Sequence, residues 1–127
     1  MNRYQLRLYA LGFAGALLAS TTALAGFRSA QQVVIFDAGR FANGDLGYVS
    51  NTADTTQYLG CYSLSDLGIC YAKDQTGLAR SCSTSDPNLL AVIRSLNGDS
   101  YLIFWWDTAG HCSSIEVANG SYSAAKR

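Results

Sequence analysis

The sequence predicts a small α+β domain: a mainly antiparallel sheet of about five strands with one short helix packed on one face, held by disulfides. Three observations support this fold class. Short apolar runs alternate with turn residues, one segment has helical periodicity, and four cysteines lie between positions 61 and 112. The strand expected over 100–107, Ser-Tyr-Leu-Ile-Phe-Trp-Trp-Asp, is the most apolar stretch after the first twenty-five residues. We expect the other elements to cover it.

Residues 1–25 have the pattern of a secretory signal peptide. Arg3 and Arg7 precede an apolar core, and Ala23-Leu24-Ala25 supplies the small residues required beside a cleavage site. The apolar core is about eleven residues long, whereas a membrane-spanning helix needs roughly twenty. Cleavage before Gly26 would leave 102 residues. We therefore expect a secreted or periplasmic protein with no membrane span after cleavage.

The charges of the expected mature chain exclude two classes of partner. Seven basic residues stand against nine acidic residues, a formal charge of −2. They are scattered along the chain, so the sequence lacks the clustered basic residues that nucleic acids and anionic membranes attract. We expect neither nucleic acid nor a membrane surface as a partner.

Cys61, Cys70, Cys82 and Cys112 all lie in the expected mature chain. An even number of cysteines in a short exported chain indicates two disulfides. The competing interpretation is a metal site, but the sequence has no Cys-x-x-Cys pair and its one histidine is His111. We therefore expect no metal and no other cofactor.

Two hairpins are expected over 57–83, and both align cysteines. The second hairpin has Gly77 in its loop where a positive φ is usually required, and its register places Cys70 opposite Cys82. The first hairpin places Cys61 opposite Cys70 in the same way. Because Cys70 can bond only one of these neighbours, the three possible disulfide pairings remain open.

The side chains of a strand alternate between its two faces. The cysteine face of these hairpins also carries aliphatic residues, so we expect it to pack on the core. Tyr58, Tyr62 and Tyr71 then face outward, with Tyr71 across from Gly60, where a ring can cover the bare backbone. Trp105, on the later apolar strand, would extend this aromatic surface.

The expected helix begins at Asp86-Pro87, where an acid can cap the free amides and proline takes the first helical position. Asn97-Gly98 would end it. After the next strand the chain turns and returns over 111–117. This return places Cys112 opposite Trp106, Ile115 opposite Ile103 and Val117 opposite Tyr101.

The rest of the chain is less regular. We expect residues 26–46 to be an N-terminal arm or edge strand, followed by a short strand near Tyr48-Val49. Residues 47–122 would form the disulfide-stabilised α+β domain, and residues 123–127 a frayed tail. The apolar residues of the arm need cover, and in one interpretation they pack on the tyrosine rings.

Candidates for catalysis are few. His111 lies beside Ser113 and Ser114 without an evident orienting acid, and most aspartates lie in expected turns. Glu116, the one glutamate, lies in an expected strand, with Arg80 or Arg94 as an ionic partner if it faces the cysteine side.

We therefore expect an exported, non-catalytic binding domain, an inhibitor of or partner to another exported protein. Tyrosines on an open face suit stacking on a sugar ring or anchoring a protein. The open alternatives are a carbohydrate-binding module that uses the tyrosines, a structural component of an envelope or matrix, and a small hydrolase around His111.

Overall fold

The computed structural model describes residues 28–123, so the expected signal peptide and residues 124–127 of the expected tail lie outside the described range. Within that range the chain forms two antiparallel sheets and two helices. The elements in chain order are β1 (Val34–Phe36), β2 (Phe41–Asp45), α2 (Leu46–Asn51), β3 (Tyr58–Ser63), β4 (Gly68–Lys73), β5 (Ala79–Thr84), α3 (Pro87–Arg94), β6 (Tyr101–Trp106) and β7 (Cys112–Ala118). No helix among the described residues is long and apolar enough to cross a membrane.

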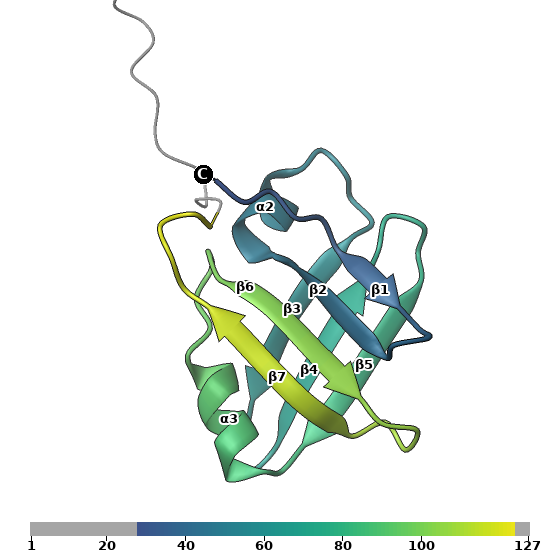
Figure 1. Ribbon diagram of the computed structural model, residues 1–127, viewed down its shortest axis with the longest axis vertical. Coiled ribbons are helices and arrows are strands. Elements are labelled where there is room, and N and C mark those ends of the chain that lie inside the picture. Colours follow the sequence, from purple (N-terminus) through teal and green to yellow (C-terminus); the bar gives the residue numbers. More distant parts are fainter. Residues whose placement is uncertain (1–27, 124–127) are drawn as a thin grey trace, which may run out of the picture.

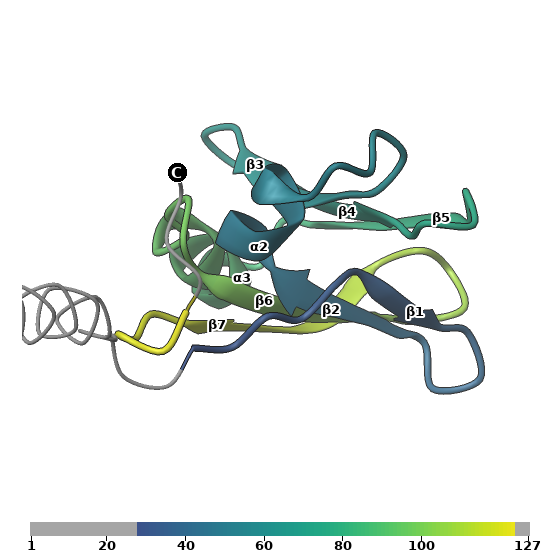
Figure 2. The same cartoon turned by 90° about the horizontal axis from the view of Figure 1, so that it is seen from above.

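The α+β class and the antiparallel pairing are confirmed, but the strands divide into two sheets rather than one. The four-stranded sheet has the order β1-β2-β6-β7 and the three-stranded sheet has the order β3-β4-β5. The two sheets form separate layers (Figures 1 and 2). Stacking the sheets buries the apolar inner face of each sheet in a common core.

The core lies between the layers. Cys70 and Ala72 of β4 are completely buried on one side of it, and Leu102 and Phe104 of β6 are completely buried on the other. The apolar stretch expected to be central to the fold is therefore an inner strand of the four-stranded sheet, covered by the cysteine face of the hairpins.

β2 was not expected from the sequence, because Phe-Ala-Asn-Gly-Asp lacks the β-branched residues typical of strands. It nevertheless lies between β1, an edge strand, and β6. Asp45, the last residue of β2, is fully buried. Its Oδ2 accepts hydrogen bonds from the Ser29 hydroxyl and the Gln31 backbone N–H, both at 2.7 Å. The carboxylate thus fixes the chain that leads into β1.

The strand expected near Tyr48-Val49 is the short helix α2, so that expectation was wrong. Gly47 and Val49 are buried. The carbonyl oxygen of Gly47 accepts hydrogen bonds from Ser50 Oγ at 3.1 Å and Asn51 Nδ2 at 2.6 Å. These local side-chain bonds satisfy a carbonyl that a sheet partner would satisfy in a strand.

Both hairpin registers are confirmed: Cys61 lies opposite Cys70, and Cys70 opposite Cys82. The disulfides are Cys61–Cys70, within the three-stranded sheet, and Cys82–Cys112, which joins β5 to β7 across the two sheets. Cys82 is used for the bond between layers, which leaves Cys70 to pair with Cys61.

The capped start of α3 is also confirmed. The Asp86 carboxylate accepts a hydrogen bond of 2.7 Å from the Asn88 backbone N–H, and Pro87 is the first helical residue. The helix ends at Arg94, before the expected Asn97-Gly98. Its buried face contacts β4 at Gly68, where a Cβ would lie 2.5 Å from Ile93 Cδ1. The glycine therefore permits the close approach of helix and sheet.

The β6–β7 register follows the expectation only at Trp106 and Cys112. A bulge beyond this pair places Ile115 opposite Phe104 rather than Ile103, and Val117 opposite Leu102 rather than Tyr101. Cys112 and Ile115 are three residues apart yet both buried, which regular alternation does not allow. The bulge resolves this conflict and turns Glu116 to the outer face, opposite Ile103.

Candidate functional site

The outer face of the three-stranded sheet carries the expected tyrosines, and we call it the tyrosine face. Two antiparallel registers set its nine residues in three rows. The rows are Tyr58–Lys73–Ala79, Gly60–Tyr71–Ser81 and Tyr62–Ile69–Ser83. Large side chains therefore gather over β3 and β4, while β5 contributes small ones.

The structure brings the three tyrosines together. Tyr71 lies between the other two, with ring centroids 5.7 Å from Tyr58 and 6.3 Å from Tyr62. Tyr58 and Tyr62 remain 44% and 49% exposed. The strand part of the N-terminal arm, Val34–Phe36, pairs with β2 in the other sheet, so it does not cover these rings.

Tyr71 covers Gly60, as expected from the register. A Cβ at Gly60 would lie 2.9 Å from Tyr71 Oη and 3.2 Å from Cζ. The hydroxyl end of the Tyr71 ring therefore lies against the bare backbone of Gly60. A glycine in mid-strand is what permits this position.

Gly60→Ala is expected to move the Tyr71 ring with little loss of stability. The new methyl group collides with the mobile end of the Tyr71 side chain, which is destabilising. Alanine loses less conformational entropy than glycine on folding, which is stabilising. The two effects oppose each other, so the change in unfolding free energy should stay within about 1 kcal/mol. Near-ultraviolet circular dichroism reports the ring position, and urea unfolding reports the stability. An unchanged aromatic spectrum would contradict the predicted displacement.

A shallow hollow of about 370 Å³ lies beside the rings, lined by Tyr58, Tyr71, Ala79, Arg80 and Ser81. Lys73 Nζ is 5.9 Å from the Tyr58 ring centroid, within the range of a cation–π contact. Arg80 forms a two-point ion pair with Asp37, with Nη2–Oδ2 at 2.6 Å and Nε–Oδ1 at 2.8 Å. Arg80 is therefore not the partner of Glu116.

Trp105 does not join the tyrosines. It lies on the outer face of the four-stranded sheet, on the other side of the core, with its ring centroid 6.3 Å from Phe41. Phe41 in turn lies 5.4 Å from Phe36. Because Trp105 alternates with the buried Phe104 along β6, and the two sheets stack by their inner faces, it cannot extend the tyrosine face.

This second aromatic surface was missed in the sequence. We call it the phenylalanine–tryptophan face and define it by Val34, Phe36, Phe41, Ile103 and Trp105. The strand registers set Phe36, Phe41 and Trp105 side by side in one row, and in the next row Asn43 lies between Val34 and Ile103. Phe36 is 51% exposed and Val34 is 41% exposed. The available signal was the pair of phenylalanines that flank the four-residue turn 37–40.

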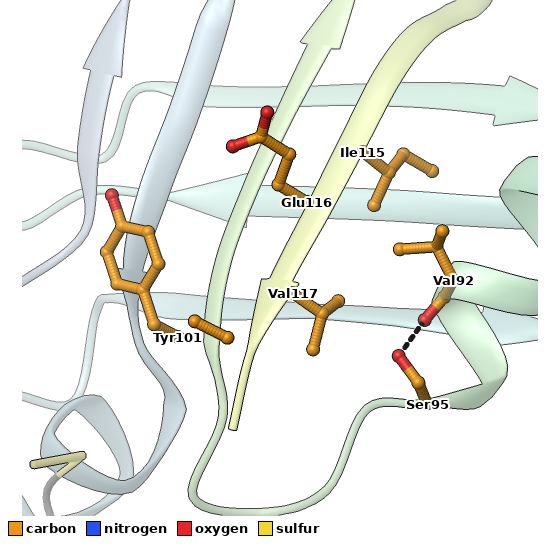
Figure 3. A pocket seen from close by; sticks show the side chains of 7 residues that line it. Val92, Ser95, Tyr101, Ile115, Glu116 and Val117 are labelled. Atoms are coloured by element: carbon orange, nitrogen blue, oxygen red, sulfur yellow. Dashed lines mark hydrogen bonds between the residues drawn. The ribbon is translucent and has the colours of Figure 1, made fainter. Parts of the chain in front are cut away.

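A groove of about 520 Å³ runs between α3 and the end of β7 (Figure 3). Its lining includes Val92, Tyr101, Glu116 and Val117. Burial, together with the carboxylates of Asp45 and Glu116, raises the pKa of Tyr101 above its ordinary value. The negative charges of Asp45 and Glu116 therefore disfavour ionisation of the Tyr101 hydroxyl.

His111 lies in the turn before β7 and contacts the aspartate that precedes it. Its Nδ1 is 3.5 Å from Asp107 Oδ2, and its backbone N–H donates to Asp107 Oδ1 at 2.9 Å. This backbone bond is the main cause that lowers the pKa of Asp107. Both side chains are well exposed, which is typical of a turn rather than of a desolvated catalytic pair. Among residues 28–123, no three metal-binding side chains come together.

Three comparisons were made with known proteins. No protein-family model, curated protein or solved structure matches this chain.

Proposed function

We propose that the chain is an exported, non-catalytic binding domain and that its tyrosine face binds another exported protein. The observation that carries this proposal is the pair of half-exposed rings, Tyr58 and Tyr62, braced by Tyr71 between them. Tyrosine loses little conformational entropy when it is buried and gives both apolar area and a hydroxyl, so it is common among the residues that dominate protein interfaces. The signal-peptide pattern and the two disulfides support export.

The ring geometry favours a protein over an extended polysaccharide. The planes of Tyr58 and Tyr71 meet at 63°, and those of Tyr62 and Tyr71 at 44°. Sugar rings in a straight chain stack best on aromatic rings that share a plane, and these rings do not. A protein loop can instead contact tilted rings and place a side chain in the hollow above Ala79 and Ser81.

The rigidity of the face suits an inhibitor or a tight partner. The tyrosines lie on strands, and Cys61–Cys70 joins β3 to β4 directly beneath them. Binding then orders few additional backbone torsions, which lowers the entropic cost of association. The proposed role does not require a catalytic residue on this face.

The test is capture from the native exported fraction with the oxidised protein as bait. We expect the oxidised protein to capture an exported protein, and we expect Tyr62→Ser or Tyr58→Ser to abolish this capture. The Kd for the partner should rise by at least about tenfold, because the loss of one central aromatic anchor costs about 2 kcal/mol or more. Tyr122→Ser is the matched control: Tyr122 is 42% exposed and lies outside the tyrosine face. Surface plasmon resonance with the purified partner gives the Kd.

Two outcomes would contradict the proposal. A partner that binds wild type and Tyr62→Ser equally well would remove the tyrosine face from the interaction. Retention on insoluble polysaccharide that is lost in Tyr62→Ser, without any captured protein, would assign the face to a glycan instead. A reduced and alkylated bait shows in each case whether the folded domain is required.

A further inference from the structure

Three of the four cysteines form one row across the three-stranded sheet. The registers place Cys61 directly opposite Cys70, and Cys70 directly opposite Cys82. Directly opposite side chains point to the same face of a sheet, so the three side chains share its inner face. Directly opposite Cα atoms, such as those of Cys70 and Cys82, lie about 4.5–5.5 Å apart, a separation that a disulfide spans. Cys70 is therefore within bonding reach of both neighbours.

The cysteines differ in their access to solvent. Cys61 lies on the edge strand β3 and is partly exposed. Cys70, Cys82 and Cys112 are all buried. Because the rate of thiol–disulfide exchange depends on access to the sulfur that is attacked, a thiol in solution should react first at Cys61.

We propose that Cys61 is a site of modification by small thiols, and that its modification opens the disulfide between the two sheets. An incoming thiolate attacks Cys61 Sγ, forms a mixed disulfide there and displaces the Cys70 thiolate. The Cys70 thiolate then attacks Cys82 Sγ, forms Cys70–Cys82 and displaces the Cys112 thiolate. Both steps are thiol–disulfide exchanges, so no oxidant or reductant is consumed. The proton that the incoming thiol gives up is taken up by Cys112.

Burial favours the second step over an arrest after the first. A Cys70 thiolate would lie in the central strand β4, completely buried in the core, where a charge without a partner is costly. Cys112 is the first residue of β7 and lies between the exposed residues His111 and Ser113. The exchange therefore moves the negative charge from the middle of the core to its rim.

The exchange would change what the disulfides hold together. Cys82–Cys112 joins β5 to β7 and so ties one sheet to the other. Cys70–Cys82 would instead join two strands of the same sheet. After the exchange, packing would hold the stacked sheets together without a covalent cross-link between them. This device does not require the tyrosine face to bind a partner.

The test is limited treatment of the oxidised protein with reduced glutathione under native conditions, followed by acid quenching and alkylation of the free thiols. Trypsin, which cuts after lysine and arginine, separates the bonds of interest. Without reduction it gives three cysteine peptides: 41–73 with Cys61 and Cys70, 81–94 with Cys82, and 95–126 with Cys112.

The links between these peptides report the exchange. In the untreated protein, 81–94 is joined to 95–126. After one glutathione has been added, we expect 81–94 to be joined to 41–73 instead, with glutathione on Cys61 and the alkyl group on 95–126. Mass spectrometry identifies each species. Glutathionylated protein that keeps 81–94 joined to 95–126 would overturn the proposal, as would a first glutathione on another cysteine or a native protein that does not react.

Two single variants isolate the second step. Cys61→Ala leaves Cys70 without its partner and opposite Cys82, so we expect the Cys70–Cys82 bond and a free Cys112 without added thiol. Cys70→Ala is the matched control: it also leaves one thiol, Cys61, which is not opposite Cys82, and Cys82–Cys112 should persist. A folded Cys61→Ala protein that keeps Cys82–Cys112 would contradict the second step.

Discussion

Replacing Phe104 with alanine is expected to lower the free energy of unfolding by about 3–5 kcal/mol. Phe104 is completely buried in the middle of β6. The registers place it between Ala42 of β2 and Ile115 of β7, and its ring lies 5.9 Å from that of Trp106. Neighbours on both flanking strands cannot collapse into the space without shifting backbone, so a cavity remains in the core.

The free energy lost in Phe104→Ala is large in relation to the total stability of the domain. A domain of this size has a total stability of about 5–15 kcal/mol, so Phe104→Ala should remove a large share of it and lower the temperature of thermal unfolding. Urea unfolding followed by tryptophan fluorescence is a direct measurement, because Trp106 reports from beside the substituted ring. Phe104→Leu, which keeps most of the apolar volume, should cost roughly half as much or less. A loss below about 1 kcal/mol for Phe104→Ala would show that β6 is not central to the core.

Much of the fold could be predicted because local chemistry and tertiary structure agree there. The hairpin around Gly77 forms in the expected register, with the glycine at φ +93°. The start of α3 depends on Asp86 and Pro87, whose capping roles need no distant partner. In these places the residues that decide the structure are neighbours in sequence.

The parts that were missed depend on distant contacts. β2 has a poor strand sequence, and it becomes a strand because β1 and β6 pair with it on both sides. The register of β7 is set by the need to bury Cys112 and Ile115 together, which depends on the position of the other sheet. The division into two sheets could not be predicted for the same reason, since it follows from how two apolar faces meet.

The candidate site shows the same limit. Alternation along β3 and β4 correctly grouped Tyr58, Tyr62 and Tyr71, because those strands are adjacent in sequence and in space. Alternation also placed Trp105 on an outer face. It gave no information about which sheet that face belongs to, and for this reason the phenylalanine–tryptophan face was not foreseen.

Removing the disulfide between the sheets is expected to cost about 3.5–4 kcal/mol, and removing the one within the hairpin about 2.5–3 kcal/mol. The difference follows from the length of chain that each bond closes: Cys82 and Cys112 are 30 residues apart, whereas Cys61 and Cys70 are 9 apart. A longer closed loop restricts the unfolded chain more strongly.

The comparison requires double variants, Cys82→Ala with Cys112→Ala and Cys61→Ala with Cys70→Ala, measured by guanidinium unfolding. A single Cys61→Ala variant would leave Cys70 unpaired directly opposite Cys82, where exchange could form a new bond and hide the loss. If the two double variants lost the same free energy of unfolding, the disulfides would not stabilise the protein mainly by restricting the unfolded chain. In that case, the contribution of Cys82–Cys112 would have to come from contacts in the folded core, where Cys82 and Cys112 are both buried, rather than from loop closure.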